Sequence, residues 1–515
     1  MDESSVVVID GDTLDLPGFL AVVEGAEVTI HPEAIARVEA SRKRVEGGIA
    51  TGATIYGINT GFGELSRVRI ETARIRELQM NLLRSHAAGV GPALPEPAVR
   101  GMLLLRANAL AKGYSGVRRE VVETLAAMLN RRVHPVIPER GSLGASGDLA
   151  PLAHLALVIA GEGEAWFQGE RLTGAEAMRR AGIPPLHLEA KEGLALINGT
   201  QLITSLGALA LARGETLLRI ADVAAAATLE VSMGTPVAAH PDIQEVRPHP
   251  GQIAVARNIR ELTRESGLVA FHRDCDRIQD AYSLRCVPQI HGAARDAIAY
   301  VRKVILTEFN AATDNPLVFE HGILSGGNFH GQPLALALDT FAIALATLAN
   351  VSERRIERLV NPALSGLPPF LAPDPGLHSG YMIAHYTAAA LALESRHAAS
   401  PASVHSLPVS ANKEDHISNG AHSARKALEV AENTERIVAI ELLLAAQALD
   451  LLHRQHPTAD LTPGPGLAAI HAGIRSEIPP LAEDRCLSPS ITRVGEMIAD
   501  GTLLAAVEAK TGPLA

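Results

Sequence analysis

The most reactive grouping in the chain is the triplet Ala145-Ser146-Gly147. If the backbone folds sharply back here, the amide nitrogen of Gly147 can attack the carbonyl carbon of Ala145. Loss of water then closes a five-membered ring, and loss of the Ser146 hydroxyl as a second water leaves an exocyclic methylene. Gly leaves the nitrogen unhindered, Ser carries the group to be eliminated, and Ala is small enough for the bend. The product would be a conjugated electrophile, which no ordinary side chain supplies.

The residues around the triplet predict a tight loop that runs into a helix. The glycines of residues 140–151 allow backbone conformations that are closed to residues with a Cβ. Asp148 stands where an N-cap belongs, and the apolar run 149–160 predicts a helix that stops at Gly161. The dipole at the start of this helix would favour negative charge on the ring. Taken alone, such a triplet is more often an ordinary turn.

The string Gly-Ser-Leu-Gly-Ala-Ser-Gly-Asp-Leu-Ala-Pro-Leu-Ala-His, residues 141–154, resembles the prosthetic-group loop of the aromatic amino acid ammonia-lyases. In that family the triplet cyclises to 4-methylideneimidazole-5-one. The resemblance covers roughly residues 6–504. It implies a mainly α, fumarase/ammonia-lyase-like fold, a long helical bundle with a small mixed α/β N-terminal part. It also implies a homotetramer with active sites shared between subunits, and no metal or nucleotide cofactor beside the autocatalytically formed ring.

A second glycine-rich loop, Tyr56-Gly-Ile-Asn-Thr-Gly-Phe-Gly63, follows a possible strand at residues 54–58. Its glycine spacing is not G-x-G-x-x-G, and no βαβ unit with an acidic ribose partner follows, which argues against a nucleotide site. A Tyr in such a loop can act as acid or base if its pKa is lowered. The loop resembles the lid loop of the family. That implies that Tyr56 abstracts the substrate β-proton and that Gly63 belongs to the substrate-binding residues.

Two positions bear on the choice of substrate. Ser85-His86 follows a predicted helix at 70–85; a lone His there is usually a capping or surface residue, but the pair resembles that of the histidine-specific branch. The tyrosine branch tends to show His-Leu at this point and the phenylalanine branch Phe-Leu. The histidine-specific branch also carries a Glu at the position of Glu414, where it can accept an imidazole N–H. Lys413 and Asn419, by contrast, depart from the usual pattern of the family.

Further substrate contacts are expected from the segment Gln279-Asp-Ala-Tyr-Ser-Leu-Arg-Cys286. Tyr282 and Arg285 are three positions apart, so on a helical turn they share a face. Arg suits bidentate binding of a carboxylate, although an isolated Arg is equally well a structural ion-pair residue. The segment resembles the substrate-carboxylate motif of the family. The resemblance assigns Arg285 to the carboxylate, Tyr282 to the ring and substrate as a catalytic residue, and Gln279 to a supporting contact.

Two more residues are placed near the ring by resemblance. Asn198, in Asn-Gly-Thr-Gln201, reads as an ordinary N-cap of a long helix that runs to about Ser232. In the family the Asn of this string lies close to the ring and the substrate amine. Phe329, in Gly-Gly-Asn-Phe-His330, would otherwise be a core Phe beside a hairpin turn, and the resemblance implies packing near the ring system.

The 515 residues allow two or three domain-sized units. We expect an N-terminal domain at 1–205 that carries the prosthetic-group loop and the Tyr lid loop, and a long-helix bundle domain at 206–515. Residues 423–456 predict a single helix of about 50 Å. A helix of that length cannot be covered within a compact monomer, which favours bundling across subunits.

Bulk properties exclude several classes of protein. The net charge of −11 gives no basic face, so we expect no nucleic acid partner. The 3 cysteines include no Cys-x-x-Cys pair, which is typical of a reducing compartment and offers neither a disulfide framework nor a zinc site. No signal peptide pattern is visible at the N-terminus, so we expect a cytoplasmic protein. The apolar run 334–351 contains Asp339 and predicts a buried helix rather than a membrane span.

The resemblance as a whole implies an enzyme that eliminates ammonia from L-histidine and releases trans-urocanate. In this interpretation Arg285 orients the carboxylate, Tyr56 removes the proton, and His86 and Glu414 recognise the imidazole. The nearest alternative is a tyrosine or phenylalanine ammonia-lyase or an aminomutase of the same family. A non-catalytic scaffold with an uncyclised triplet is an alternative of another class. The Gly-Ser-Ser-x-Met-Pro-type loop of fumarase-like lyases is absent from the sequence.

Overall fold

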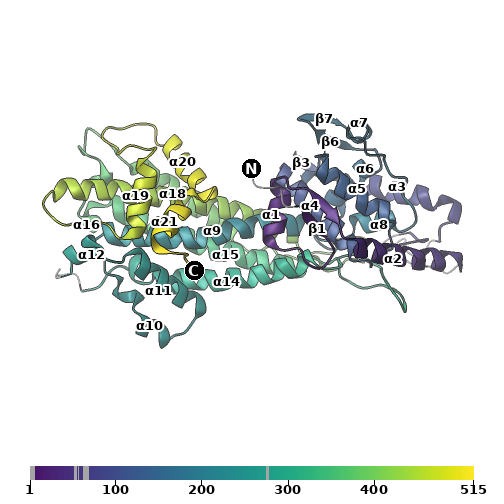
Figure 1. The fold of residues 1–515 in the computed structure, drawn as a ribbon, viewed down its shortest axis with the longest axis horizontal. Coiled ribbons are helices and arrows are strands. Elements are labelled where there is room, and N and C mark those ends of the chain that lie inside the picture. Colours follow the sequence, from purple (N-terminus) through teal and green to yellow (C-terminus); the bar gives the residue numbers. More distant parts are fainter. Residues whose placement is uncertain (1–5, 52–54, 56, 62–68, 274–277) are drawn as a thin grey trace. The chain divides into compact units, whose positions relative to one another are not determined.

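The fold is mainly helical, as the sequence predicts (Figure 1). The computed structural model describes residues 6–51, 55, 57–61, 69–273 and 278–515. By contacts the chain groups into two compact units, each made of several segments. The first unit comprises Met1–Leu209, Arg302–Asp339 and Pro401–Arg425, and the second comprises Ala210–Val301, Thr340–Ser400 and Lys426–Ala515.

Long helices carry the chain from one unit into the other. They are α9 (Gln201–Val231), α14 (Val287–Phe309), α15 (Gln332–Val360) and α18 (Gly420–Gln455). The units therefore interleave along the sequence. The contiguous division after residue 205 differs from this grouping and stays a prediction. The long helix expected at 423–456 is confirmed as α18, which begins three residues earlier and ends one residue earlier.

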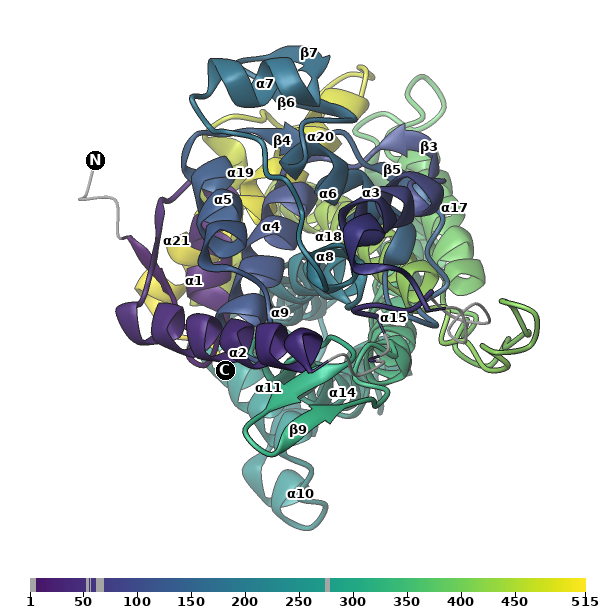
Figure 2. The same ribbon diagram turned by 90° about the vertical axis from the view of Figure 1, so that its right-hand side faces the viewer.

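The first unit also contains shorter helices. They are α1 (Leu16–Glu24), α2 (Pro32–Ala50), α3 (Ile75–His86), α4 (Glu96–Ala111), α5 (Arg119–Asn130), α6 (Leu149–Ile159), α7 (Gly174–Arg180) and α8 (Glu192–Ile197), with a 3-10 turn, η2, at Thr72–Arg74. Helices α3, α6 and α8 contact one another pairwise and lie close together in Figure 2. Because α6 leaves the triplet directly, this cluster of helices fixes one end of the loop.

The strands are short and form small separate sheets. They are β1 (Val7–Ile9), β2 (Val28–Ile30), β3 (Val90–Ala93), β4 (His134–Pro135), β5 (Pro138–Arg140), β6 (Glu164–Phe167), β7 (Glu170–Thr173), β8 (Leu317–Phe319) and β9 (Gly322–Leu324). Strands β1 and β2 are parallel, whereas β3–β5, β4–β6–β7 and β8–β9 are antiparallel. Strand β5 ends at Arg140, paired with Val90, so the pairing holds the entry to the ring loop.

The second unit contains shorter helices beside its shares of the long ones. They are η3 (Pro236–Ala239), α10 (Pro241–Glu245), α11 (Pro250–Leu262), α12 (Gly267–Phe271), α13 (Tyr282–Arg285), α16 (Pro362–Ser365), η4 (Pro369–Leu371), α17 (Met382–Ala398), α19 (Pro465–Arg475), α20 (Ser488–Ala499) and α21 (Thr502–Thr511). Two stretches, Glu192–Val231 and Gln332–Val360, are long and apolar enough to cross a membrane. Within their most apolar windows 94% and 72% of the residues are buried, as in core helices.

The packing of α9 against α15 depends on small residues. A Cβ built on Gly214 would lie 2.6 Å from Cε2 of the Phe341 ring, closer than carbon atoms approach without displacement. Gly495 in α20 is the opposite case, because nothing lies within 4 Å of a Cβ built there. Substituting Ala at Gly214 would test both packing and helix propensity, whereas Ala at Gly495 would test helix propensity alone.

We expect Gly214→Ala to lower the melting temperature and Gly495→Ala to raise it slightly. Overpacking costs about 1–3 kcal/mol, which exceeds the gain of about 1 kcal/mol from placing Ala in a helix. At Gly495 only the propensity gain applies. Thermal denaturation of both variants beside the unsubstituted protein measures the difference, and equal shifts would contradict the close approach of α9 to α15.

Candidate active site

The triplet Ala145-Ser146-Gly147 lies in a loop that several segments hold in place. Ala145 and Gly147 are buried, whereas Ser146 is half-buried and borders a cavity. The carbonyl oxygen of Gly144 accepts hydrogen bonds from the Gly331 amide at 3.0 Å and from the Ser418 hydroxyl at 2.9 Å. Segments far apart in the sequence therefore fix the position of the loop.

Asp148 anchors the other end of the loop, in a way that the sequence did not indicate. It occupies the N-cap position of α6, but its side chain makes no capping hydrogen bond, so the expected capping role is wrong. The carboxylate instead accepts from the Ser142 hydroxyl at 2.6 Å and from the Ile203 amide at 3.0 Å. Burial raises the pKa of Asp148 to about 6, against the lowering effect of these hydrogen bonds.

Asn198 lies directly beside the triplet. It follows α8, and α9 begins only at Gln201, so Asn198 is not the N-cap that the sequence suggests. Its Nδ2 donates to the carbonyl oxygen of Ser146 at 2.8 Å and lies 3.4 Å from the Ser146 hydroxyl. Its own carbonyl oxygen accepts from Nη1 of Arg106 at 2.8 Å. Arg106 therefore fixes the Asn198 backbone, while the Asn198 side-chain amide contacts Ser146, the residue that would lose its hydroxyl.

Buried charges lie behind Asn198. Lys191 and Asp314 form an ion pair of 2.7 Å with side chains 0% and 1% exposed. Burial lowers the pKa of Lys191 and lowers that of Arg106 to about 10, in both cases partly offset by the charge of Asp314. Sequence patterns gave no signal for this group, since Lys and Arg are expected at the surface.

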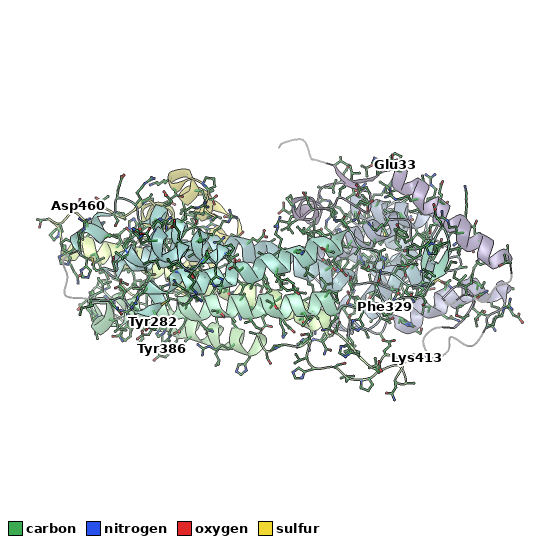
Figure 3. All side chains as sticks on the ribbon, turned by 90° about the horizontal axis from the view of Figure 1, so that it is seen from below. Glu33, Tyr282, Phe329, Tyr386, Lys413 and Asp460 are labelled. Atoms are coloured by element: carbon green, nitrogen blue, oxygen red, sulfur yellow. The ribbon has the colours of Figure 1, made fainter. Side chains whose placement is uncertain are left out.

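A cavity of about 460 Å³ borders the triplet within the first unit. It brings together Ala145, Ser146, Asn198, Phe329 and Glu414, all of which were candidates from the sequence. Its remaining lining residues are Leu194, Asn315, Ser325, Gly326, His330, Lys413, Asp415 and His416. Figure 3 labels Phe329 and Lys413 in this part of the molecule.

Glu414 and His330 both line the cavity. Burial raises the pKa of the half-buried Glu414. Nδ1 of His330 accepts from the Gln332 amide at 3.3 Å, so Nε2, 3.2 Å from the His416 carbonyl oxygen, is the donor of the ring. The His330 and His416 rings stack with centroids 5.9 Å apart. His330 therefore connects the Phe329 segment to the Glu414 loop, a link that sequence analysis missed.

Of the other candidates in the first unit, the described residue His86 is not among the residues that line this cavity. His86 ends α3, with its Nδ1 2.9 Å from the carbonyl oxygen of Leu82 and 3.0 Å from the Ser85 hydroxyl, and burial lowers its pKa. Tyr56 and Gly63 lie outside the described residues. Gln279, Tyr282 and Arg285 belong to the second unit.

Tyr282 and Arg285 share a face of α13, as their spacing predicts. The guanidinium carbon of Arg285 lies 5.9 Å from the centre of the Tyr282 ring, and Arg285 donates to Oε1 of Gln279. Tyr282 is 72% exposed and projects from the surface in Figure 3. Among the described residues no carboxylate forms an ion pair with Arg285, whose guanidinium contacts the Gln279 side chain and the Tyr282 ring.

The triplet itself fits a backbone-derived ring. Gly147 has a φ of +79°, and a Cβ built on it would lie 2.3 Å from the carbonyl oxygen of Gly199. Only Gly can occupy this position without displacing the neighbouring backbone. Ala145 and Ser146 are the small residue and the hydroxyl-bearing residue that the cyclisation requires. Within the described parts of the chain, no group of three or more His, Cys, Asp or Glu side chains could hold a metal ion.

Comparison with known proteins identifies the family of the chain. The family model for aromatic amino acid lyases matches residues 14–476. The chain belongs to the aromatic amino acid lyase family. A curated histidine ammonia-lyase from Stigmatella aurantiaca is 54% identical to the lyase over 506 residues, 98% of each chain. Ammonia-lyases break carbon–nitrogen bonds, and the enzyme is a carbon–nitrogen lyase.

Solved structures show the same fold. The crystal structure of histidine ammonia-lyase from Trypanosoma cruzi matches the lyase with a TM-score of 0.90 at 44% identity, over 98% of this chain and 96% of that one. The structure of tyrosine aminomutase from Streptomyces globisporus matches with a TM-score of 0.93 at 39% identity, over 99% and 100% of the two chains. Proteins named for different substrates therefore share this fold.

We expect Gly147→Ala to destabilise the lyase by at least about 2 kcal/mol. Left-handed backbone with a Cβ costs about 1–2 kcal/mol, and overpacking against Gly199 adds about 1–3 kcal/mol. Gly326→Ala is the matched control, since Gly326 also borders the cavity but has open space around its Cβ and no positive φ. Thermal denaturation compares the two, and an unchanged melting temperature for Gly147→Ala would refute the close approach to Gly199.

Proposed function

We propose that this enzyme eliminates ammonia from L-histidine and releases trans-urocanate. The observation that carries the proposal is the placement of Glu414 in one cavity with Ala145, Ser146 and Asn198. A carboxylate accepts an imidazole N–H, whereas a phenyl or phenol ring gives it no equivalent task. The names of the curated relatives at about 52–54% identity point to the same substrate.

The same proposal includes a prosthetic ring formed autocatalytically from Ala145-Ser146-Gly147. When formed, 4-methylideneimidazole-5-one supplies an electrophile that turns the substrate amine into a better leaving group. The residues that would hold it are those that contact the loop. Asn198 donates to the Ser146 carbonyl oxygen at 2.8 Å, and Asp148 receives hydrogen bonds from both Ser142 and Ile203.

Several side chains would bind and orient the substrate. Glu414 would accept the imidazole N–H, with His86 assisting, and Phe329 would form the apolar wall beside the ring. Arg285, which pairs with no described carboxylate, would bind the substrate carboxylate bidentately, supported by Gln279. This contact supplies orientation, which is a large part of the rate enhancement in reactions of positioned groups.

The acid–base residues complete the proposal. Tyr56 would remove the β-proton, and Gly63 would contribute to substrate binding in the same loop. Tyr282, which stacks with Arg285, would act near the ring and the substrate. No metal or nucleotide takes part.

The enzyme would act as a cytoplasmic homotetramer with active sites shared between subunits. Apolar side chains on one stripe of α17 support association, since Ile383, Tyr386 and Leu393 are 56%, 63% and 52% exposed. Figure 3 shows Tyr386 at the surface. We expect neither nucleic acid nor a membrane as a partner, because the net charge is −11 and the apolar helices are largely buried.

A second candidate is a tyrosine or phenylalanine ammonia-lyase or an aminomutase. The structural similarity to tyrosine aminomutase, at 39% identity, favours it as the alternative. Lys413 borders the cavity beside Glu414, where the sequence departs from the family pattern. The two candidates differ in substrate rather than in the reactive loop.

We expect the purified enzyme to release ammonia from L-histidine but not from L-tyrosine or L-phenylalanine. The near-ultraviolet absorbance of the acrylate product identifies which substrate reacts. Coumarate or cinnamate in place of urocanate would support the second candidate. If no ammonia appears, the intact mass shows whether the triplet has lost two waters. A mass without that loss would support the alternative of a non-catalytic scaffold.

Glu414→Gln should reduce kcat/KM for histidine by about a hundredfold or more, because the amide is a weaker acceptor and cannot exchange a proton. Any cinnamate-forming side activity should be spared. Asp415→Asn is the matched control, since Asp415 lines the same cavity but is exposed, and it should change turnover by no more than about twofold. Equal losses for both amino acid substrates in Glu414→Gln would refute the imidazole contact.

A further inference from the structure

A cluster of fully buried ionisable side chains lies in the second unit and has no part in the proposed chemistry. It consists of Asp222, His291, Arg355 and Glu441, whose side chains are 0% or 1% exposed. Burying charges costs free energy unless each is paired and hydrogen-bonded. The hydrogen bonds within the cluster determine which atoms the Arg355 guanidinium can contact outside it.

Glu441 fixes the orientation of Arg355. Its Oε1 accepts from Nε of Arg355 at 2.5 Å and its Oε2 from Nη2 at 2.9 Å, which is a bidentate ion pair. The two oxygens also accept from the hydroxyls of Thr228 at 2.7 Å and Ser352 at 2.5 Å. With the carboxylate saturated, Nη1 of Arg355 is the donor left to act elsewhere.

Nη1 of Arg355 faces His291 and α13. It lies 3.3 Å from Nε2 of His291 and 3.5 Å from the carbonyl oxygen of Ser283. Because a guanidinium only donates, Nε2 of His291 accepts and the ring proton is on Nδ1. Nδ1 donates to Oδ1 of Asp222 at 2.7 Å, and burial lowers the pKa of His291.

Ser283 lies within the four-residue helix α13, between Tyr282 and Arg285. So short a helix has little stability of its own and depends on contacts with its surroundings. The segment before it is held as well, because Oδ2 of Asp280 accepts from the Thr235 amide at 2.8 Å. Arg355 thus contacts the carbonyl side of the turn that carries Arg285.

We propose that Arg355 is a positioning residue that, held by Glu441 and His291, fixes α13 so that Arg285 meets the substrate carboxylate. The inference rests on the proposed function, which assigns the carboxylate to Arg285. Loss of this positioning should weaken the binding of ligands that carry a carboxylate and should not change the binding of ligands that carry only the imidazole.

The test uses Arg355→Lys in the full-length enzyme. Lysine keeps the positive charge opposite Glu441, but one ammonium cannot reach Glu441, His291 and Ser283 together. Inhibition of histidine turnover is measured with imidazole-4-propionate, which has a carboxylate, and with histamine, which has none. The inhibition constant of the propionate should rise by about tenfold, because one aligned hydrogen bond to its carboxylate is lost. The inhibition constant of histamine should change by no more than about twofold.

Two further variants separate positioning from folding. Thr228→Val removes a hydroxyl from Glu441 without contacting α13, so both inhibition constants should stay unchanged. His291→Gln replaces one neutral side chain by another and provides a second test if Arg355→Lys does not fold. It should raise the inhibition constant of the propionate by about threefold and leave that of histamine unchanged. Equal weakening of both inhibitors, or no weakening of the propionate, in either folded variant would overturn the proposal.

The outcome also separates this inference from the proposed function. An unsubstituted enzyme that neither converts histidine nor binds either inhibitor would refute the proposed function before any variant is compared. An unsubstituted enzyme that converts histidine, with variants that show no selectivity for the carboxylate, would refute the positioning role alone.

Discussion

The close approach of two backbone segments, at Gly147 and Gly199, is the constraint on which the site depends. The Asp148 amide donates to the Gly199 carbonyl oxygen at 2.6 Å, and neither glycine has space for a Cβ. This approach brings the turn after α8 against the ring loop, so that the Asn198 side chain reaches Ser146. A Cβ on Gly147 would displace the Gly199 backbone, and the contact between Asn198 and Ser146 would be lost with that displacement.

The floor and the walls of the cavity are built differently. Behind Asn198, which lines the cavity, lie Arg106, whose Nη1 donates to the Asn198 carbonyl oxygen, and the buried ion pair of Lys191 with Asp314. The walls that carry Phe329 and Glu414 are loop segments, which vary more easily without disturbing the core. The fold itself is shared by enzymes named for histidine and for tyrosine.

Local patterns predicted the elements, and tertiary contacts decided the details. Helix α6 and the long helix α18 follow from apolar periodicity and from their flanking residues, and both lie close to the predicted ranges. The partners of Asp148 are Ser142 and Ile203, the latter on another helix, so a local capping rule could not identify them. Lys191 was equally unpredictable, because a buried Lys is recognised only once Asp314 is placed beside it. Tyr56 and Gly63 lie outside the described residues, and their roles stay predictions.

The interleaving of the two units has a consequence for biosynthesis. The ring loop leaves the ribosome early, but the hydroxyl that binds the Gly144 carbonyl oxygen belongs to Ser418, 274 residues further along. Contacts of such sequence separation form late and slow the folding of a chain. A nascent chain therefore holds the reactive triplet in an incompletely restrained loop through most of translation. The contacts that hold the Gly144 carbonyl oxygen are therefore complete only after residues 401–425 of the first unit have been synthesised and have docked.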